Sequence, residues 1–309
     1  MVDTTSAYYQ NHNSTCLFYT LFQPKNTEAK ATLLILHGMK EHCGRYSDFA
    51  NFLANSGYAV VVYDHLGHGK TAKTPGGLGY FQKHLPVQKL IEDAKSMAEL
   101  IEGLFANLPH FVMGHSMGSF ITRCLLQQAS YRFSGAIIMG SGGKVPIAKL
   151  GKALLSVFNQ WIPDYRSPFL NKMFDKSNNF HFRKEPDDHG CNWLSRNRDN
   201  RQVFQKDPLC GVDFSINGFY ALASVNVQAT EKQWANQLSK DFPLFFVSGK
   251  EDPIGNFGKG IQQTIDDLKQ NHFTEINMKL YPNMRHEILN ENDKQVVYED
   301  ILKWLNAHC

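Results

Sequence analysis

The chain has 309 residues, of which 42% are hydrophobic and 20% are charged, and its formal net charge is +3. This length and composition suit one large α/β domain, or a core with an inserted smaller unit. The small net charge and the scattered basic residues argue against a nucleic-acid partner.

Cysteine usage and hydropathy bear on the cellular compartment. The six cysteines occur without C-x-x-C pairs or regular spacing, so a disulfide framework is not expected and a reducing compartment fits better. Residues 1–15 have neither the basic nor the apolar region of a secretory signal. No apolar run reaches the roughly 18 residues that a membrane span requires. The sequence therefore predicts a cytoplasmic protein.

Short apolar runs alternate with amphipathic segments along most of the chain, beginning with a strand expected at 15–24. Further strands are expected at 31–38, 58–65, 110–116, 134–142, 242–252 and 276–283. The central runs are continuous rather than alternating, as in strands whose sheet is covered on both faces. Residues 89–104 have apolar positions at helical spacing. The pattern predicts an α/β fold with a mostly parallel central sheet flanked by helices.

This alternation stops between about 144 and 238. The stretch contains helical patterns at 147–162 and 232–238, but no strong buried-strand run. We therefore expect a core made of residues 1–143 and 239–309, with residues 144–238 inserted as a helical cap.

A serine lies between two glycines where a strand gives way to a helix. Residues 114–118, Gly-His-Ser-Met-Gly, fit the G-x-S-x-G pattern, after an apolar run at 110–113 and before a helical pattern at 119–129. Such a turn exposes the serine hydroxyl at the N-terminus of a helix, whose dipole favours developing negative charge. We therefore predict that Ser116 is a nucleophile, although the motif alone also occurs in ordinary turns.

A nucleophilic serine requires a base and an acid, which follow in the order Ser…Asp/Glu…His in this fold class. Asp252 ends the run at 242–252, and His286 follows the strand at 276–283. Because the carboxyl ends of parallel strands meet at one edge of a sheet, both can approach Ser116. His286 is the predicted general base, and Asp252 is preferred over the neighbouring Glu251 as the residue that orients it.

The charge of the reacting oxyanion also needs stabilising. Residues 37–39, His-Gly-Met, follow the strand at 31–36, and the glycine allows the backbone N–H of Met39 to point inward. Its expected partner is the N–H of Met117, directly after the nucleophile.

Other sites are less well supported. "GHGKT" at 67–71 resembles a P-loop, but Asp64 occupies the position of the required first glycine. His37, His42, His65 and His68 lack the Cys or carboxylate spacing of a metal site, so we expect loop histidines that hold neighbouring backbone. The segment at 286–289 lacks the second histidine of a zinc protease. No metal and no cofactor are predicted.

Together these motifs resemble the monoglyceride lipase and lysophospholipase branch of the α/β-hydrolases. "HGMKEHCGRY", "YDHLGHGKT", "GHSMGS", "SGKEDP" and "YPNMRHEILNE" are similar to its loops and triad segments, and "WLSRN" and "DPLCG" resemble the cap of its bacterial members. The resemblance implies an α/β-hydrolase fold and a serine esterase that cleaves monoacyl lipid esters through an acyl-enzyme. Met39 departs from the family, which usually has a small residue there.

The expected helix at 147–162 has one apolar stripe, formed by Leu150, Leu154, Val157, Phe158, Trp161 and Ile162. In the family this face of the cap guides lipid, which makes Leu154, Phe158 and Trp161 candidates for substrate binding and for transient contact with a membrane surface. Stripes at this spacing are more often packed inward, and we expect packing here.

Two other enzymatic functions remain open. A serine aminopeptidase of the same superfamily would need acidic cap residues for a substrate ammonium, and Asp187 and Asp188 are the only adjacent pair there. A general short-chain carboxylesterase would use the same triad. A non-enzymatic binding module is disfavoured because no triad member is missing.

Overall fold

The computed structural model describes the chain except residues 13–14, 73, 75–76, 146 and 187. Its centre is an eight-stranded sheet with the order β1-β2-β4-β3-β5-β6-β7-β8. The strands are β1 (Val2–Gln10), β2 (Cys16–Pro24), β3 (Ala31–Leu36), β4 (Tyr58–Tyr63), β5 (His110–His115), β6 (Gly135–Met139), β7 (Leu244–Gly249) and β8 (Ile276–Tyr281).

The sheet is mostly parallel, as the sequence predicts. Strands β3 to β8 pair in parallel, whereas β2 pairs antiparallel with both β4 and β1. The inner strands β3, β4, β6 and β7 are buried along their whole length, which explains their continuous apolar sequences.

Strand β1 is a strand that the sequence did not predict. Most of its side chains are exposed or half-buried, so its residues show no apolar run. Its stability comes from a ladder of backbone pairs with β2, from Val2 opposite Pro24 to Gln10 opposite Cys16. Pairing to an existing edge does not require the hydrophobic pattern from which we identified the other strands.

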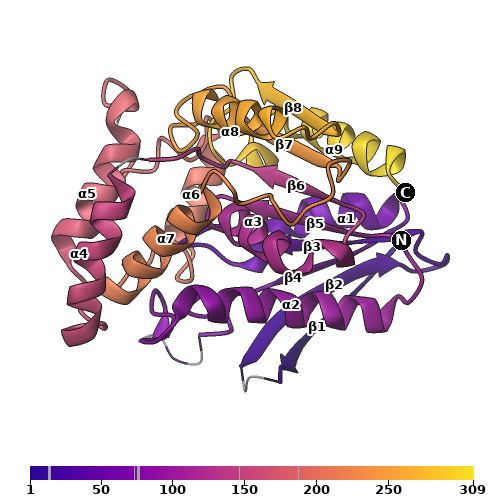
Figure 1. Cartoon of the computed structure of the whole chain (residues 1–309), viewed down its shortest axis with the longest axis horizontal. Coiled ribbons are helices and arrows are strands. Elements are labelled where there is room, and N and C mark those ends of the chain that lie inside the picture. The colour runs from indigo at the N-terminus through magenta and orange to yellow at the C-terminus, as the bar shows by residue number, and fades with distance from the viewer. Residues whose placement is uncertain (13–14, 73, 75–76, 146, 187) are drawn as a thin grey trace.

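Helices cover both faces of the sheet (Figure 1). Helices α1 (Ser47–Asn55) and α9 (Lys294–Ala307) contribute to the buried apolar cluster on one face. Helices α2 (Pro86–Leu104), α3 (Met117–Ala129) and α8 (Lys259–Gln270) contribute to the cluster on the other face. The expected α/β-hydrolase architecture is therefore present, with the start of α3 and the carboxyl ends of β5 to β8 free to form a site.

The segment between β6 and β7 contains α4 (Ala148–Trp161), α5 (Pro168–Asn179), α6 (Arg198–Lys206) and α7 (Ile216–Ala229). Helices α4 and α5 lie at the end of the molecule opposite both chain termini (Figure 1). Residues 232–238, expected to be helical, form turns instead. Trp234, Ala235 and Leu238 are nevertheless buried, so their apolar spacing reflects packing of a turn and not a helix.

The expectation that the apolar stripe of α4 packs inward is wrong. Leu150 is 70% exposed and Trp161 is 80% exposed. The helix is held instead by its opposite side, where the buried Asn159 donates to the carbonyl of Lys83 and accepts from Asn217 on α7. Because a polar side chain anchors α4, its apolar stripe faces outward.

Within the described part of the chain, no helix combines the length and the hydropathy needed to cross a bilayer. The cysteines are all free thiols.

Candidate active site

Ser116 lies in a strained turn between β5 and α3. Its backbone has φ 53° and ψ −119°, a conformation that is costly for a residue with a side chain. Its N–H donates to the carbonyl of Met139 on the neighbouring strand at 3.0 Å. The sequence-predicted turn is therefore present, and it holds the serine at the N-terminus of α3.

The two flanking glycines are required by close packing. A Cβ atom on Gly118 would lie 2.1 Å from the carbonyl oxygen of Leu36, and one on Gly114 would lie 2.2 Å from the carbonyl oxygen of Gly118. Both distances are far below van der Waals contact. Glycine at these positions lets α3 approach β3 and β5 closely enough to form the sharp turn.

His286 and Asp252 form a buried pair. The Nδ1 atom of His286 lies 3.0 Å from Oδ2 of Asp252, which also accepts from the hydroxyl of Ser248 at 2.8 Å. The other carboxylate oxygen accepts from the backbone N–H of Ile254 at 2.9 Å. Burial would raise the pKa of Asp252, but the charge and hydrogen bonds of His286, with those of Ser248 and Ile254, lower it below its usual value. The carboxylate is therefore ionised and fully hydrogen-bonded.

Glu251, the competing carboxylate, lies elsewhere. It forms a two-pronged ion pair with Arg196, with distances of 2.8 Å to Nε and 2.7 Å to Nη2. The structure thus gives the histidine partner to Asp252 and leaves Glu251 at the surface of the cap junction.

One cavity of about 100 Å³ has Ser116, His286 and Met39 in its wall. Met39 follows β3 and is buried, and Met117 is the first residue of α3, directly after Ser116. The carboxyl edge of the sheet therefore brings together four separate segments of the chain, which contain Met39, Ser116 with Met117, Asp252 and His286.

Two aromatic rings enclose the ring of His286. The ring centroid of His115 lies 4.6 Å away, and that of Trp193, from the cap, lies 5.0 Å away. Neither contact was predicted from the sequence, although both residues lie inside quoted motifs. The rings restrict the rotation of His286 and shield it from solvent.

A buried carboxylate, Glu41, lies beneath the site and was also missed. It accepts from the backbone N–H of Gly38 at 2.6 Å, from the hydroxyl of Tyr46 at 2.8 Å and from Arg45 at 3.2 Å. Nδ1 of His115 lies 3.1 Å from the same carboxylate. Burial would raise the pKa of Glu41, but the hydrogen bond and charge of His115, together with Arg45, hold it well below its usual range.

The surroundings of His115 favour its protonated form. Its Nδ1 faces Glu41, and its Nε2 lies 3.2 Å from the carbonyl oxygen of His286. The Tyr46 hydroxyl also lies 3.0 Å from Nδ1, and it donates its own proton to Glu41. Donation from both ring nitrogens of His115 therefore satisfies the acceptors around it. Burial would lower the pKa of His115, but Glu41 raises it above its usual value. A hydrogen-bonded ion pair therefore connects the loop that contains Gly38 to the backbone of His286.

The loop histidines hold neighbouring backbone, as expected. Nδ1 of His37 lies 2.7 Å from the carbonyl of Gly38, and Nε2 of His37 accepts from the N–H of His65 at 3.0 Å. Nε2 of His68 accepts from the N–H of Lys40 at 3.3 Å. Burial lowers the pKa of His65 to about 3 and that of His68 to about 4, so both rings are neutral.

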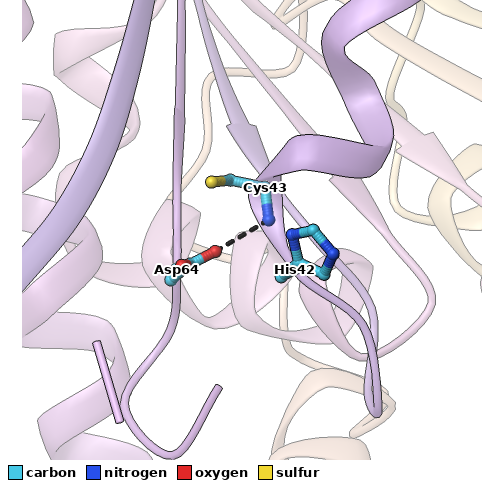
Figure 2. A group of neighbouring side chains, drawn as sticks. All are labelled: His42, Cys43 and Asp64. Carbon is cyan, nitrogen blue, oxygen red and sulfur yellow. Dashed lines mark hydrogen bonds between the residues drawn. The ribbon is translucent and has the colours of Figure 1, made fainter. Parts of the chain in front are cut away.

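His42, Cys43 and Asp64 bring possible metal-ligand atoms within 4.8 Å of one another. Figure 2 shows Asp64 bonded to the backbone of Cys43, at 2.7 Å, and its other oxygen accepts from the N–H of Lys70 at 2.6 Å. Burial raises the pKa of the Cys43 thiol far above its usual value. The carboxylate thus already accepts two backbone hydrogen bonds, and the thiol is protonated. The cluster therefore holds the loop at Cys43 to the loop at Asp64 by hydrogen bonds.

The three cap candidates do not behave alike. Leu154 and Phe158 line an apolar groove of about 540 Å³ between α4 and α5, whereas Trp161 is not among the residues that line this groove. Phe174 on α5 lines both this groove and the cavity of Ser116. Asp188 is engaged by Arg201, with an oxygen-to-Nε distance of 2.6 Å, and Asp187 lies outside the described residues.

Comparison with known proteins agrees with this architecture. A monoacylglycerol lipase of Mycolicibacterium smegmatis is 24% identical over 297 residues, which cover 94% of this chain and 93% of that protein. A mouse monoglyceride lipase is 30% identical over 129 residues, which cover 42% of this chain and 40% of that protein.

Solved structures share the fold over almost the whole chain. A carboxyl esterase from Bacillus coagulans, solved with glycerol, has a TM-score of 0.89 at 25% identity, with 98% of both chains covered. The monoglyceride lipase of Saccharomyces cerevisiae has a TM-score of 0.76 at 21% identity, with 98% of this chain and 94% of that chain covered.

The family described as serine aminopeptidase, S33, matches residues 27–293, which include β3, the turn at Ser116, the cap and His286. The chain therefore belongs to this family of α/β-hydrolases, in its monoglyceride lipase and lysophospholipase branch, and is a hydrolase.

Proposed function

We propose that the chain is a serine carboxylester hydrolase that cleaves monoacyl lipid esters, of the monoacylglycerol or lysophospholipid type, through an acyl-enzyme. The observation that carries the proposal is the strained Ser116 in one cavity with His286, whose other ring nitrogen is bonded to the buried carboxylate of Asp252. The relatives named monoacylglycerol lipase support the choice of an ester.

In the first half of the reaction, Nε2 of His286 accepts the proton of Ser116 while its oxygen attacks the ester carbonyl carbon. The carbonyl oxygen becomes an oxyanion, which the backbone N–H groups of Met39 and Met117 stabilise. Asp252 holds the tautomer with hydrogen on Nδ1 and stabilises the imidazolium. His286 then protonates the departing alcohol as the tetrahedral intermediate collapses to the acyl-enzyme.

In the second half, a water molecule takes the place of the alcohol. His286 removes a proton from this water, whose oxygen attacks the acyl carbon, and the same N–H groups stabilise the second oxyanion. Collapse returns the proton from His286 to Ser116 and releases the fatty acid. All steps use groups of this chain and water alone.

The apolar groove of the cap is the proposed site for the acyl chain. Its wall includes Leu154, Phe158, Leu170 and Met173, and Phe174 extends from it to the cavity of Ser116. Each methylene that enters such a groove gains about 0.8 kcal/mol by leaving water. A medium-length or long acyl chain is thereby favoured strongly over an acetyl group. We place the cap at residues 144–238 and the core at residues 1–143 and 239–309.

Transient contact between the cap and a membrane surface is part of the proposal. Large apolar side chains are exposed along α4 and the segment that follows it, including Ile147, Leu150, Leu154, Val157, Phe158, Trp161, Ile162, Tyr165 and Phe169. Exposed apolar surface of this extent is unusual unless it binds something, and an amphipathic helix can lie in a lipid interface. The emission of Trp161 should shift to the blue on addition of phospholipid vesicles, and Trp161→Phe should abolish that shift, because the other tryptophans are buried.

Labelling with a fluorophosphonate tests the serine mechanism. Wild-type protein should react covalently, Ser116→Ala should not react, and His286→Ala should lose most labelling while keeping its melting temperature. Normal labelling of the histidine variant would refute the proposed base.

Substrate class is tested by parallel assays of monooctanoylglycerol, p-nitrophenyl acetate and an aminoacyl p-nitroanilide. We expect the octanoyl ester to be preferred. Preference for the anilide would establish an aminopeptidase instead, and preference for the acetate would establish a short-chain esterase.

A further inference from the structure

Lys40 is a buried lysine in the wall of the catalytic cavity. Its side chain is only 7% exposed, and its Nζ atom lies 3.4 Å from Oδ1 of Asp175 on α5. The same ammonium lies 5.6 Å from the ring centroid of Phe174. The carboxylate of Asp175 is 43% exposed, so the partner of this buried cation is partly solvated and lies at a long hydrogen-bonding distance. A desolvated ammonium in that state favours any closer anion.

The backbone of Lys40 fixes where this ammonium lies. Its N–H donates to Nε2 of His68 at 3.3 Å, and its carbonyl accepts from the N–H of Gly211 in the cap at 2.9 Å. Its φ of 58° lies in the left-handed region, where glycine would avoid the strain that a lysine side chain causes. The strain is located beside Met39, within the loop that contributes an oxyanion donor, which is a place where strained residues commonly serve a function.

The other charged groups in this wall are occupied. Glu41 is bonded to His115, and Glu287 accepts from Arg45 at 2.5 Å. These side chains belong to the buried network beneath the site, so they balance one another. Among the described residues of this wall, Lys40 and Asp175 therefore form the ion pair whose carboxylate an anionic group of the substrate can replace.

Helix α5 separates an apolar approach to the cavity from a polar one. Phe174 faces the acyl groove, whereas Asp175 and His189 are shared with a polar cavity of about 540 Å³ on the other side. The charged side chains in the wall of this polar cavity are Lys172, Lys176, Arg183, Asp175, Glu185 and Asp213.

With Glu185 and Asp175 already paired, three exposed cations of this wall face one exposed carboxylate, Asp213, and this excess of positive charge favours an anionic ligand. Glu185 is already bound by Arg285 at 2.5 Å, and Asp175 faces Lys40. Lys172, Lys176 and Arg183 are exposed and raise the local concentration of anions. The polar side of α5 therefore leads an anionic group inward toward Lys40.

Substrate entry must change the pair of Lys40 with Asp175. The cavity of about 100 Å³ is smaller than the roughly 300 Å³ of the smallest ligand sites, so we expect α5 to move outward when a lipid ester enters. Asp175 moves with α5, while Lys40 stays on the loop of the core. The ammonium is then left buried without its carboxylate.

We propose that Lys40 selects monoacyl esters whose head group bears a phosphate, and that this phosphate replaces the carboxylate of Asp175 when the cap opens. The inference rests on the proposed esterase function and narrows its substrates to the phosphate-bearing class, with Lys40 as the residue that selects them. The acyl chain lies on the Phe174 side of α5 and the phosphate on the Asp175 side. The scissile ester between them lies at Ser116.

The test compares two water-soluble substrates with the same acyl chain, monooctanoylglycerol and its phosphate monoester. The readout is the ratio of kcat/KM for the phosphate ester to kcat/KM for the neutral ester. Lys40→Gln should lower this ratio about tenfold, the loss of one charge-assisted hydrogen bond, and Lys40→Arg should restore most of it. Asp175→Asn should raise the ratio, because the competing carboxylate is gone. Lys184→Gln, at an exposed cap lysine outside both walls, controls for overall charge.

An equal loss of activity on both substrates in Lys40→Gln would show that Lys40 only supports the loop, and would overturn the inference. A lower ratio in Asp175→Asn would also overturn it. Because this variant changes no backbone contact of the Lys40 loop, its result does not depend on whether Lys40 supports that loop. Wild-type protein that hydrolyses the neutral ester but not the phosphate ester refutes the inference and leaves the proposed function intact. Wild-type protein that hydrolyses neither refutes the proposed function.

Discussion

Replacing Asp252 by asparagine should inactivate the enzyme without unfolding it, because the surrounding hydrogen bonds determine how the amide must lie. The N–H of Ile254 requires an acceptor opposite it, where Oδ1 of Asp252 now lies. The amide oxygen of the substituted side chain would therefore take that place, and its NH₂ group would take the position of Oδ2. That position faces Nδ1 of His286 and the hydroxyl of Ser248, and the hydroxyl can rotate to accept.

The new NH₂ group donates to Nδ1 of His286, so the ring must carry its hydrogen on Nε2. This tautomer cannot accept the proton of Ser116. The variant also loses the attraction between the carboxylate and the imidazolium, which are 3.0 Å apart. At an effective dielectric constant of about 20, opposite charges at this distance attract by about 5 kcal/mol, which corresponds to roughly 10⁴-fold in rate.

The assay is kcat for p-nitrophenyl octanoate, with the melting temperature measured in parallel. Glu251→Gln is the matched control, because it removes the adjacent carboxylate, which pairs with Arg196 at the surface. Partly exposed pairs of this kind contribute up to about 1 kcal/mol to stability. If the whole of that energy were lost from the transition state, kcat would fall by about fivefold, so we expect a smaller loss. A loss below tenfold in Asp252→Asn, or a larger loss in Glu251→Gln, would refute the reasoning.

Three further predictions concern stability and specificity. His65 and His68 have pKa values of about 3 and about 4 in the folded chain, so both take up protons on unfolding below pH 6.5. These two rings alone should lower the free energy of unfolding by up to about 2.7 kcal/mol per pH unit between pH 6 and pH 4.5, and His37, whose pKa burial also lowers, adds to this slope. Urea titrations that show no such slope would contradict this. Glu41→Gln should cost about 3–5 kcal/mol, and most between pH 4.5 and 6.5. Because the pKa of His115 is raised in the folded chain, the cost should decline as the pH rises from 6.5 through that raised pKa, and it should decline below about pH 4.5 because the carboxylate of the unfolded chain is then protonated. A cost independent of pH in urea titrations argues against the ion pair. Phe158→Ala should change the ranking of kcat/KM among p-nitrophenyl esters from two to twelve carbons, whereas Trp161→Ala, outside the groove, should not. Equal effects of the two substitutions would contradict the proposed acyl site.

The sequence predicts the sheet well because buried strands and sharp turns have local signatures. Continuous apolar runs identify the inner strands, and the glycines around Ser116 identify a turn that only close packing explains. The pairing of Asp252 with His286 was predicted from the order of residues after strands, which parallel topology converts into proximity. The inner strands, the turn at Ser116 and this pair can therefore be predicted from local patterns in a single sequence.

Features that depend on contacts between distant segments were not predictable in the same way. The exposure of Trp161 follows from Asn159, whose hydrogen bond to Asn217 of α7 sets which side of α4 faces inward. A helical stripe gives the direction of an apolar face but not whether another element covers it. Glu41 and Lys40 were visible in a quoted motif, yet their partners come from β5 and α5.

The buried ion pair of Glu41 and His115 links two parts of the site that come from different strands. Glu41 holds the N–H of Gly38, directly before Met39, and His115 donates to the carbonyl of His286. Burying a single charge here would cost several kcal/mol, but the carboxylates of Glu41 and Glu287 face the cations of His115 and Arg45, so the cluster is balanced. A hydrophobic substitute could fill the same volume without directing either backbone group. The network therefore sets the distance between the loop at Gly38 and the backbone of His286, the proposed general base, and stability alone does not explain its presence.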